Sequence, residues 1–336
     1  MNNGSNRNNT NIEPTNKAFP TVPGSKGLLS NINEAYGLAE KIGYPVIIKA
    51  ASGGGGRGMR MVKNEEDFTN SFNSAQSESK IAFDNDEVYI EKYFTQPRHI
   101  EIQILSDIHG NTFAFGEREC SIQRRHQKVI EESPSPIINN ETRKKMCDTA
   151  VLAAKSVNYV GAGTIEFLYD PLTDNFYFME MNTRIQVEHP VTEFVTNVDL
   201  VKHQILCHAG LALPSKYKDL NLRGHSIECR INAEDPDKNF MPSPGTLTSV
   251  HFPGGLGVRV DSSVYTGYTI PSNYDSMIAK VIVHAQSRIE AINKMYTSLD
   301  ECVISGIKTN IEFQKKILKN DSFIKGDFNT NFLNNF

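Results

Sequence analysis

A run of glycines between two strand-like segments constrains the fold of this chain more than any other feature. Ser52–Gly58 reads SGGGGRG and lies between the apolar segments Tyr44–Ala50 and Met59–Lys63. A dinucleotide-binding fingerprint needs a helix that opens at its last glycine, whereas Met59–Lys63 alternates like a strand. A Walker A loop needs a Gly-Lys-Ser/Thr ending, which this run lacks. The sequence therefore predicts a loop that joins two strands.

Such a loop can cover a nucleotide, because its backbone N–H groups can meet phosphate oxygens. Lys49 directly precedes the loop and could supply a positive charge to those phosphates. The alternative is a flexible hairpin beside an ordinary surface lysine. The loop by itself leaves both interpretations open.

A predicted β-hairpin places two acidic residues face to face. If Asp170 pairs with Phe176, Glu166 falls directly opposite Glu180. Like charges facing each other across a ladder are destabilising unless something compensates them. A divalent cation such as Mg²⁺ is the usual remedy at a nucleotide site, and Asn182 could be a third oxygen ligand on the same face.

Polar residues continue beyond this hairpin with period two. If the chain stays extended, one face carries five of them: Glu180, Asn182, Arg184, Gln186 and Glu188. A solvated strand face would alternate in the same way. We expect Leu168, Phe176 and Phe178 to share or flank the carboxylate face, which favours a cleft. The basic run Gln123–Lys128 is predicted to be an anion-binding loop beside it, the alternative being a solvated surface.

The composition excludes several functional classes. The 336 residues carry 35 basic and 39 acidic side chains, a net charge of −4, so we expect no binding to nucleic acid or to an anionic membrane. No apolar run approaches the ~20 residues that a membrane span needs. Five scattered cysteines without a C-x-x-C pair indicate reduced thiols. The asparagine-rich residues 1–18 are predicted to be a disordered tail.

The rest of the chain reads as α+β with mainly antiparallel strands. In the segment that begins at Thr95, polar residues alternate with Ile100, Ile102 and Ile104, the pattern of a half-buried strand. Helices are predicted between Asn31 and Gly43, from Asn64, and over Glu141–Ser156, Asp199–His208, Ser287–Cys302 and Asn310–Leu318.

Several segments together resemble the ATP-grasp superfamily, and specifically the biotin carboxylases. They read YPVIIKAASGGGGRGMR, EKYFTQPRHIEIQ, ERECSIQRRHQKVIEESP, GAGTIEF, FMEMNTRIQVEHPVTE, ECRINAEDP and YDSMIAK. The resemblance implies an ATP-grasp fold with a small glycine-lid lobe (19–94) and a larger, mainly antiparallel lobe (95–210). A biotin carboxylase C-terminal domain (211–336) would follow. The family also carries an N-terminal domain ahead of the point where this chain becomes recognisable, so the resemblance implies a chain that lacks it.

The resemblance implies ATP-dependent carboxylation of biotin with bicarbonate, and it assigns roles by position. The ATP positions are Lys49, Gly54, Gly55, Gly56, Met59, Glu91, Lys92, Phe94, His99, Gln123, His126 and Leu168, with leucine usual in the family at Phe94. The Mg²⁺ or Mn²⁺ ligands would be Glu166, Glu180 and Asn182. Bicarbonate would meet Arg184, Gln186 and Val187. The catalytic set would be Glu188 as the base, Lys128 between phosphate and bicarbonate, and Arg184 and Arg259 against the biotin enolate.

No Ala-Met-Lys-Met biotin-attachment signature occurs in the chain. The resemblance therefore implies that biotin arrives on a separate carboxyl carrier protein and passes to carboxyltransferase subunits. It further implies a homodimer of the acetyl-CoA carboxylase type, in the cytoplasm or the plastid stroma. Two alternatives stay open: a component of a propionyl-CoA or pyruvate carboxylase, and a catalytically weak or inactive scaffold.

Overall fold

The computed structural model of the protein describes residues 19–50, 59–83 and 86–336. The predicted tail (1–18) and the predicted glycine loop with Gly54, Gly55 and Gly56 lie outside the described residues. Within these ranges every ladder between strands is antiparallel, which confirms the predicted α+β class. All five cysteines are free. No helix in the described ranges is long and apolar enough to cross a membrane.

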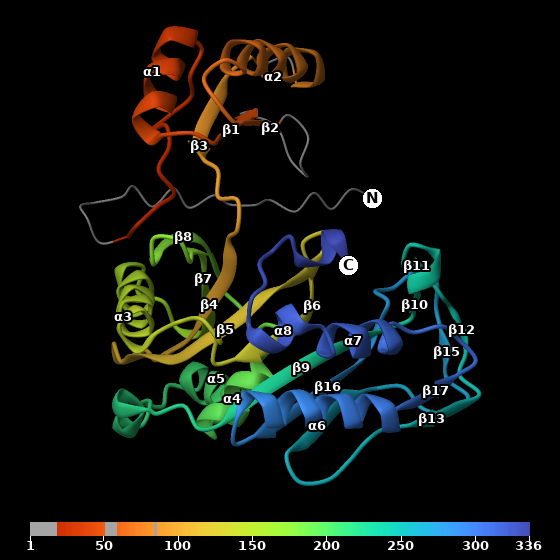
Figure 1. Ribbon diagram of the computed structural model, residues 1–336. Helices are drawn as coiled ribbons and strands as arrows, with labels where there is room; N and C mark the ends of the chain where they lie inside the picture. The colour runs from red at the N-terminus through yellow and green to blue at the C-terminus, as the bar shows by residue number, and fades with distance from the viewer. Residues whose placement is uncertain (1–18, 51–58, 84–85) are drawn as a thin grey trace, which may run out of the picture.

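A small lobe stands above the rest of the chain and is joined to it by the connection that follows β3 (Figure 1). Its three-stranded sheet has the order β2-β1-β3. The elements are α1 (Ile32–Ile42), β1 (Val46–Ala50), β2 (Met59–Val62), α2 (Phe68–Phe83) and β3 (Val88–Lys92). As predicted, Asn31 caps α1 by accepting a hydrogen bond from the Asn33 N–H. Gly43 ends the helix with a φ of 80°, where glycine is not strained.

An eight-stranded sheet forms the body of the described structure, in the order β14-β16-β9-β6-β5-β4-β7-β8. The strands are β4 (Arg98–Ser106), β5 (Thr112–Arg124), β6 (Gln127–Ser133), β7 (Gly161–Asp170), β8 (Asn175–Asn182), β9 (His225–Asn232), β14 (Val258–Ser262) and β16 (Met277–Ala285). The sheet is continuous from strands β4 to β8 into the C-terminal third of the chain, because β6 pairs with β9.

Helices cover the apolar face of this sheet. Ile100 and Ile102 of β4 pack with α3 (Asn140–Ser156), and Ile227 of β9 packs with α6 (Arg288–Glu301). The other helices and short strands are α4 (His189–Thr196), α5 (Leu200–His208), η1 (Ser215–Asp219), β10 (Glu234–Asp235), η2 (Pro236–Lys238), β11 (Met241–Pro242), β12 (Gly245–Thr246), β13 (Ser249–His251), β15 (Thr269–Ile270), β17 (Val303–Ser305), α7 (Ile311–Leu318), α8 (Asp321–Lys325) and η3 (Phe332–Asn335).

The opposite face of the sheet carries buried polar residues beside a second apolar cluster that includes Leu105 and Phe115. Glu101 and Gln103 of β4 are both fully buried, so the prediction of a half-buried strand is wrong. The alternation on β4 separates an apolar face from a buried polar face. Glu101 and Gln103 on that second face both accept hydrogen bonds from Arg118, so their polar groups have partners despite the burial.

A bulge corrects the predicted register of the β7–β8 hairpin. Near the turn the pairs are Asp170 with Asn175 and Phe167 with Phe178, one residue away from the prediction. The register then shifts, and Glu166 lies opposite Glu180 as predicted. Phe178 therefore packs on the apolar side of the sheet and does not flank the carboxylates, and the same holds for Phe176. Leu168 does line a pocket beside Glu166.

The predicted basic loop is the tip of a hairpin. β5 ends at Arg124 and β6 begins at Gln127, and the two turn residues Arg125 and His126 have positive φ angles of 49° and 65°. β6 also shifts its register between Ile130 and Lys128. Because of this shift, Ile130 stays in the apolar core while Lys128 reaches the polar face.

Candidate active site

A pocket of about 350 Å³ opens on the polar face of the large sheet. Its lining is mostly charged or amide-bearing, which suits a small, highly charged substrate better than an apolar one. The lining residues are His99, Gln123, His126, Gln127, Lys128, Glu166, Glu180, Asn182, Arg184, Gln186, Val187, Glu188, Arg230, Asn232, Asp275 and Met277.

Glu188 lies between two cations in this pocket. Its Oε1 is 2.5 Å from Nζ of Lys128, and its Oε2 is 2.9 Å from Nη2 of Arg230. The carboxylate is 2% exposed, so these two bonds replace its hydration. The chain leaves the extended conformation after Asn182, and Glu188 is the N-cap of α4. The predicted extended strand is thus wrong beyond Asn182, yet all five residues of its polar face line the pocket.

A fully buried arginine supports the floor of the pocket. Arg118 donates to Glu101 at 2.5 Å, to Gln103 at 2.6 Å and to Gln186 at 3.0 Å. Burial disfavours its charge, but Glu101 and Glu188 still raise the pKa of Arg118. Gln186 in turn donates to Glu166 at 2.9 Å. Sequence reasoning assigned no role to Arg118, because only the fold brings Gln186, which lies between β8 and α4, next to Glu101 and Gln103 of β4.

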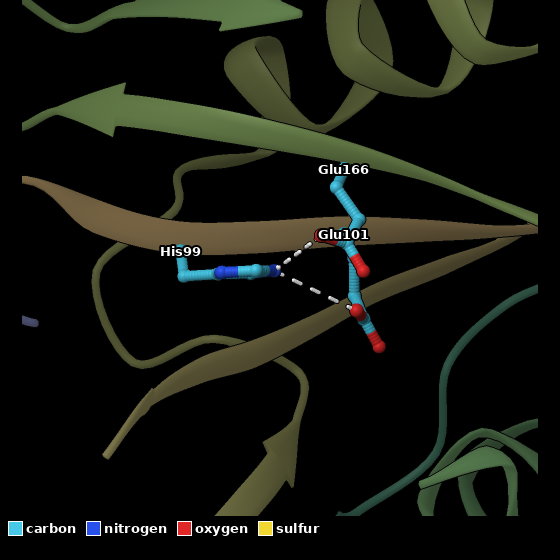
Figure 2. Close-up of side chains that lie close together, drawn as sticks. All are labelled: His99, Glu101 and Glu166. Carbon is cyan, nitrogen blue, oxygen red and sulfur yellow. Dashed lines mark ion pairs between the residues drawn. The ribbon is translucent and has the colours of Figure 1, made fainter. Parts of the chain in front are cut away.

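His99 forms an ion pair with two carboxylates, and Figure 2 shows its ring directed at both. Its Nε2 lies 3.2 Å from Glu166 and 3.8 Å from Glu101. Burial lowers the pKa of His99, but the two neighbouring carboxylates outweigh it and raise this pKa to about 9. The ring is therefore a cation at neutral pH. Glu101 and Glu166 therefore hold the charged ring as an ion pair.

Glu166, Glu180 and Asn182 offer oxygen atoms of the kind that Mg²⁺ prefers. Glu166 is 6% exposed and accepts hydrogen bonds from Asn182 and Gln186, both at 2.9 Å. Glu180 is exposed on the facing strand and lines the same pocket. Glu166 is also paired with His99 at 3.2 Å and with Lys128 at 3.5 Å. The carboxylates of Glu166 and Glu180, on facing strands, together fit a divalent cation.

A second pocket of about 510 Å³ adjoins the first and shares its walls. Its lining residues are His99, Gln123, Arg125, His126, Glu166, Leu168, Met179, Glu180, Thr330, Asn331 and Asn334. Thr330 reaches it from the C-terminal end of the chain, where its N–H donates to the Pro97 carbonyl oxygen at 3.0 Å. Leu168 and Met179 contribute apolar surface to this pocket.

Five of the predicted nucleotide residues belong to the small lobe or to the connection that follows it. Lys49 pairs with Glu91 at 2.5 Å across β1 and β3. Lys92 donates to the carbonyl oxygens of residues 43 and 44, at 3.0 Å each. Phe94 contacts Tyr177 with ring centroids 4.9 Å apart, and Met59 is exposed on β2. None of these five lines either pocket in the part of the chain that the structure describes.

Comparison with known proteins identifies the family. Residues 228–335 match the biotin carboxylase C-terminal domain, and residues 8–216 match the carbamoyl-phosphate synthase L chain, ATP binding domain. The chain is 56% identical over 317 residues to biotin carboxylase 1 of Bacillus subtilis. That match covers 94% of this chain and 70% of the relative. The chain belongs to the biotin carboxylase family.

Other members of the biotin carboxylase family extend the comparison. A pyruvate carboxylase subunit from Methanothermobacter thermautotrophicus is 53% identical, over 94% of this chain and 64% of the relative. A solved structure of the biotin carboxylase domain dimer of Hydrogenobacter thermophilus 2-oxoglutarate carboxylase contains MgADP, ADP and bicarbonate. It superimposes with a TM-score of 0.81 at 48% identity and covers 94% of this chain and 70% of that one. The fold is thus the ATP-grasp fold followed by the C-terminal domain of this family, as predicted.

Within this biotin carboxylase fold the structure does not bring Arg259 into the pocket. Its guanidinium donates to Glu193 at 2.6 Å and to Asp261 at 2.7 Å, and it lines neither described pocket. Arg230 of β9 lines the pocket and contacts Glu188 instead. The segment ECRINAEDP carries part of the family resemblance, but no role was predicted for its arginine. A role for Arg230 could not be predicted without knowing that β9 pairs with β6, the strand that carries Lys128.

Proposed function

We propose that this chain carboxylates biotin at the expense of ATP, with bicarbonate as the carbon source. The observation that carries this proposal is the position of Glu188 between Lys128 and Arg230, in a pocket that also contains the Glu166–Glu180 pair. The arrangement combines a carboxylate base, cations for anionic substrates and oxygen ligands for a divalent cation. That combination fits phosphoryl transfer to an oxygen anion.

We propose that the second pocket receives the nucleotide and directs its phosphates toward Lys128. Leu168 and Met179 offer apolar contact to the base, while His99 and Lys128 offer positive charge. Lys49 belongs to this set only if its ammonium leaves Glu91 for phosphate. Glu166, Glu180 and Asn182 would hold Mg²⁺ or Mn²⁺, which when bound supplies charge neutralisation to the phosphates.

Bicarbonate would enter between Arg184, Gln186 and the Val187 backbone, beside Glu188. Glu188 removes its proton, and the resulting dianion attacks the γ-phosphorus of ATP to give carboxyphosphate and ADP. Carboxyphosphate divides into CO₂ and phosphate, and this phosphate takes the ureido proton from biotin. The biotin enolate then attacks CO₂.

The enolate needs a cation close to its oxygen, and Arg230 suits that role better than Arg259. Arg230 lines the pocket, whereas both partners of Arg259 lie outside it. We therefore assign stabilisation of the enolate to Arg230 together with Arg184.

We propose that biotin reaches the pocket on a separate carrier protein and that the carboxylated carrier serves a carboxyltransferase, as in an acetyl-CoA carboxylase. The 53% identity to a component of a pyruvate carboxylase keeps that enzyme class as the second candidate. We further propose a homodimer, a location in the cytoplasm or the plastid stroma, and a division into 19–94, 95–210 and 211–336. The two family matches adjoin near that last boundary, between residues 216 and 228.

The test is phosphate release by the purified chain with Mg²⁺–ATP, bicarbonate and free biotin, with each substrate omitted in turn. We expect release that requires bicarbonate and rises with biotin, together with ¹⁴C-bicarbonate incorporation into biotin. ATP binding without bicarbonate-dependent turnover would favour the scaffold interpretation. Offering purified carriers from an acetyl-CoA carboxylase and a pyruvate carboxylase then separates the two candidates.

A further inference from the structure

Two buried carboxyl groups lie beneath the pocket and carry three oxygen atoms without a partner among the described residues. Glu131 of β6 faces Glu228 of β9 directly in the ladder, and both side chains are fully buried. The three atoms are Oε2 of Glu131 and both carboxyl oxygens of Glu228. An unpaired buried carboxylate is very costly, so this arrangement needs an explanation.

Glu131 holds the pocket arginine through its other oxygen. Oε1 of Glu131 accepts from Nε of Arg230 at 2.6 Å and from Nη2 at 2.5 Å. The same Nη2 donates to Oε2 of Glu188 at 2.9 Å. One guanidinium nitrogen thus joins the buried carboxylate to the proposed base. The rotamer of Arg230 is fixed from below by Glu131 and from the pocket by Glu188.

Two cations, Lys280 and Arg230, act on Glu228 through their charge, but both bind other groups. Arg230 is bound to Glu131 and Glu188, and Lys280 of β16 donates to the Val187 carbonyl oxygen at 2.7 Å and pairs with Asp261 at 3.2 Å. Glu131 opposes Glu228 with like charge. Burial, followed by the charge of Glu131, raises the pKa of Glu228 well above its usual value.

We propose that Glu131 and Glu228 share one proton and act as a positioning pair for Arg230, with Glu131 as the anion that anchors the guanidinium. Glu228 is then a carboxylic acid whose O–H donates to the free Oε2 of Glu131. That single proton gives partners to two of the three unpaired oxygens. The physical reason is that two carboxylates close together in a buried site repel each other and cannot both be ionised.

With one shared proton, the pair Glu131 and Glu228 carries a net charge of −1. This is enough to anchor Arg230 and leaves its Nη2 in contact with Glu188. A second negative charge would draw the guanidinium toward the sheet and away from Glu188. Glu131 and Glu228 touch no substrate in this scheme, so they are positioning residues. Their effect on turnover rests on the proposed function, while their protonation state does not.

The first test is spectroscopic and independent of activity. Infrared spectra of the parent and of Glu228→Gln, at neutral pH in D₂O, should differ by the carbonyl stretch of one protonated carboxylic acid. A difference in the carboxylate bands alone would show that Glu228 is ionised and would overturn the proposal. A parent that shows the acid band but no turnover would contradict the proposed function and leave the shared proton standing.

The second test compares three substitutions of the same size. Glu228→Gln keeps the charge of the protonated group, so kcat should stay within about threefold of the parent. Glu131→Gln removes the anchor, and kcat of biotin carboxylation should fall by ~10-fold to 100-fold with little change in the KM for ATP. Glu132→Gln is the matched control, because Glu132 is equally buried on the neighbouring position of β6 but pairs with Arg288 and His225 outside the pocket.

In Glu131→Gln, Glu228 could ionise and bind Arg230 in place of Glu131. The double variant Glu131→Gln/Glu228→Gln removes this second carboxyl group, and it should lose at least as much activity as Glu131→Gln. Circular dichroism and thermal unfolding confirm that each variant is folded before its kinetics are compared. Equal losses in Glu228→Gln and Glu131→Gln would contradict the proposal, as would a Glu131→Gln kcat equal to that of the Glu132→Gln control.

Discussion

The ammonium of Lys128 lies 2.5 Å from Oε1 of Glu188 and 2.6 Å from Oε2 of Glu101. Burial disfavours the charge on Lys128, but these two carboxylates are close enough to raise its pKa well above the usual value. Glu101 is held in turn by Arg118 at 2.5 Å. The cation therefore stays charged and fixed, and it keeps the carboxylate of Glu188 at the wall of the pocket where an anionic substrate would bind.

Glu188→Gln should separate the base from the binding groups. The amide can still accept a hydrogen bond from Lys128, but it cannot take a proton from bicarbonate. We expect ATP affinity close to that of the parent and bicarbonate-dependent ATP cleavage lower by ~10²-fold or more, the scale of losing a general base. Phosphate release measures the cleavage, and calorimetry measures the affinity.

The control for this variant is Glu141→Gln, which makes the same chemical change at an exposed position of α3, outside the pocket. It should leave both quantities unchanged. If Glu188→Gln cleaves ATP at the rate of this control, Glu188 is not the base.

Glu180→Gln tests the carboxylate pair. Glu180 is exposed, so the free energy of unfolding should stay within about 0.5 kcal/mol of the parent. Loss of one carboxylate from a metal site should nevertheless weaken binding of Mg²⁺–ATP by ~10-fold or more. Calorimetric titration with Mg²⁺–ATP, repeated with ATP and a chelator, checks this. Equal affinities of parent and variant for Mg²⁺–ATP would remove the argument from the facing carboxylates.

Arg230→Lys and Arg259→Lys should differ in their effect on turnover. Lysine keeps the charge but loses the forked geometry with which Arg230 reaches both Glu131 and Glu188. We expect the Arg230 variant to lose ~10²-fold in biotin-dependent turnover, the scale of losing one oxyanion donor. The Arg259 variant should lose much less, because its partners lie outside the pocket. A larger loss at Arg259 would restore the role that the sequence suggested for it.

Local patterns were sufficient to predict most of the fold. Asn31 and Gly43 marked both ends of α1, because capping depends on a few neighbouring residues. The alternation of Ile100 and Ile102 located β4. The exposure of its polar face could not be read from the same alternation, because a buried polar face and a solvated one have identical periodicity.

The site was harder to predict than the fold, since it depends on bulges and on strand order. The facing of Glu166 and Glu180 was predicted correctly from a register that is wrong at the turn, and a bulge restored it. A second register shift brings Lys128 to the polar face. Arg230 joins them through the pairing of β6 with β9, which no local pattern specifies.

The last prediction concerns a buried ion pair that fastens the C-terminal segment to the sheet. Glu132 lies 2.7 Å from Nε of Arg288 and 2.6 Å from Nε2 of His225, and Arg288 also donates to the Phe323 carbonyl oxygen. Burial acts to raise the pKa of Glu132, but Arg288 and His225 lower it from 4.5 to about 2. That difference corresponds to stabilisation on the order of 3 kcal/mol when the carboxyl group is ionised in both states.

The sign of the pH dependence follows from this depressed pKa. The stabilisation is fully present above the unfolded pKa of 4.5 and is lost as the pH falls from there through about 2. Glu132→Gln should therefore be less stable than the parent at pH 7, and the difference should shrink at about pH 3. Urea unfolding of both proteins across this range measures it, and subtracting the variant cancels the other carboxyl groups. A difference that is the same at both pH values would show that the packing of Glu132, and not its charge, holds Arg288 in place.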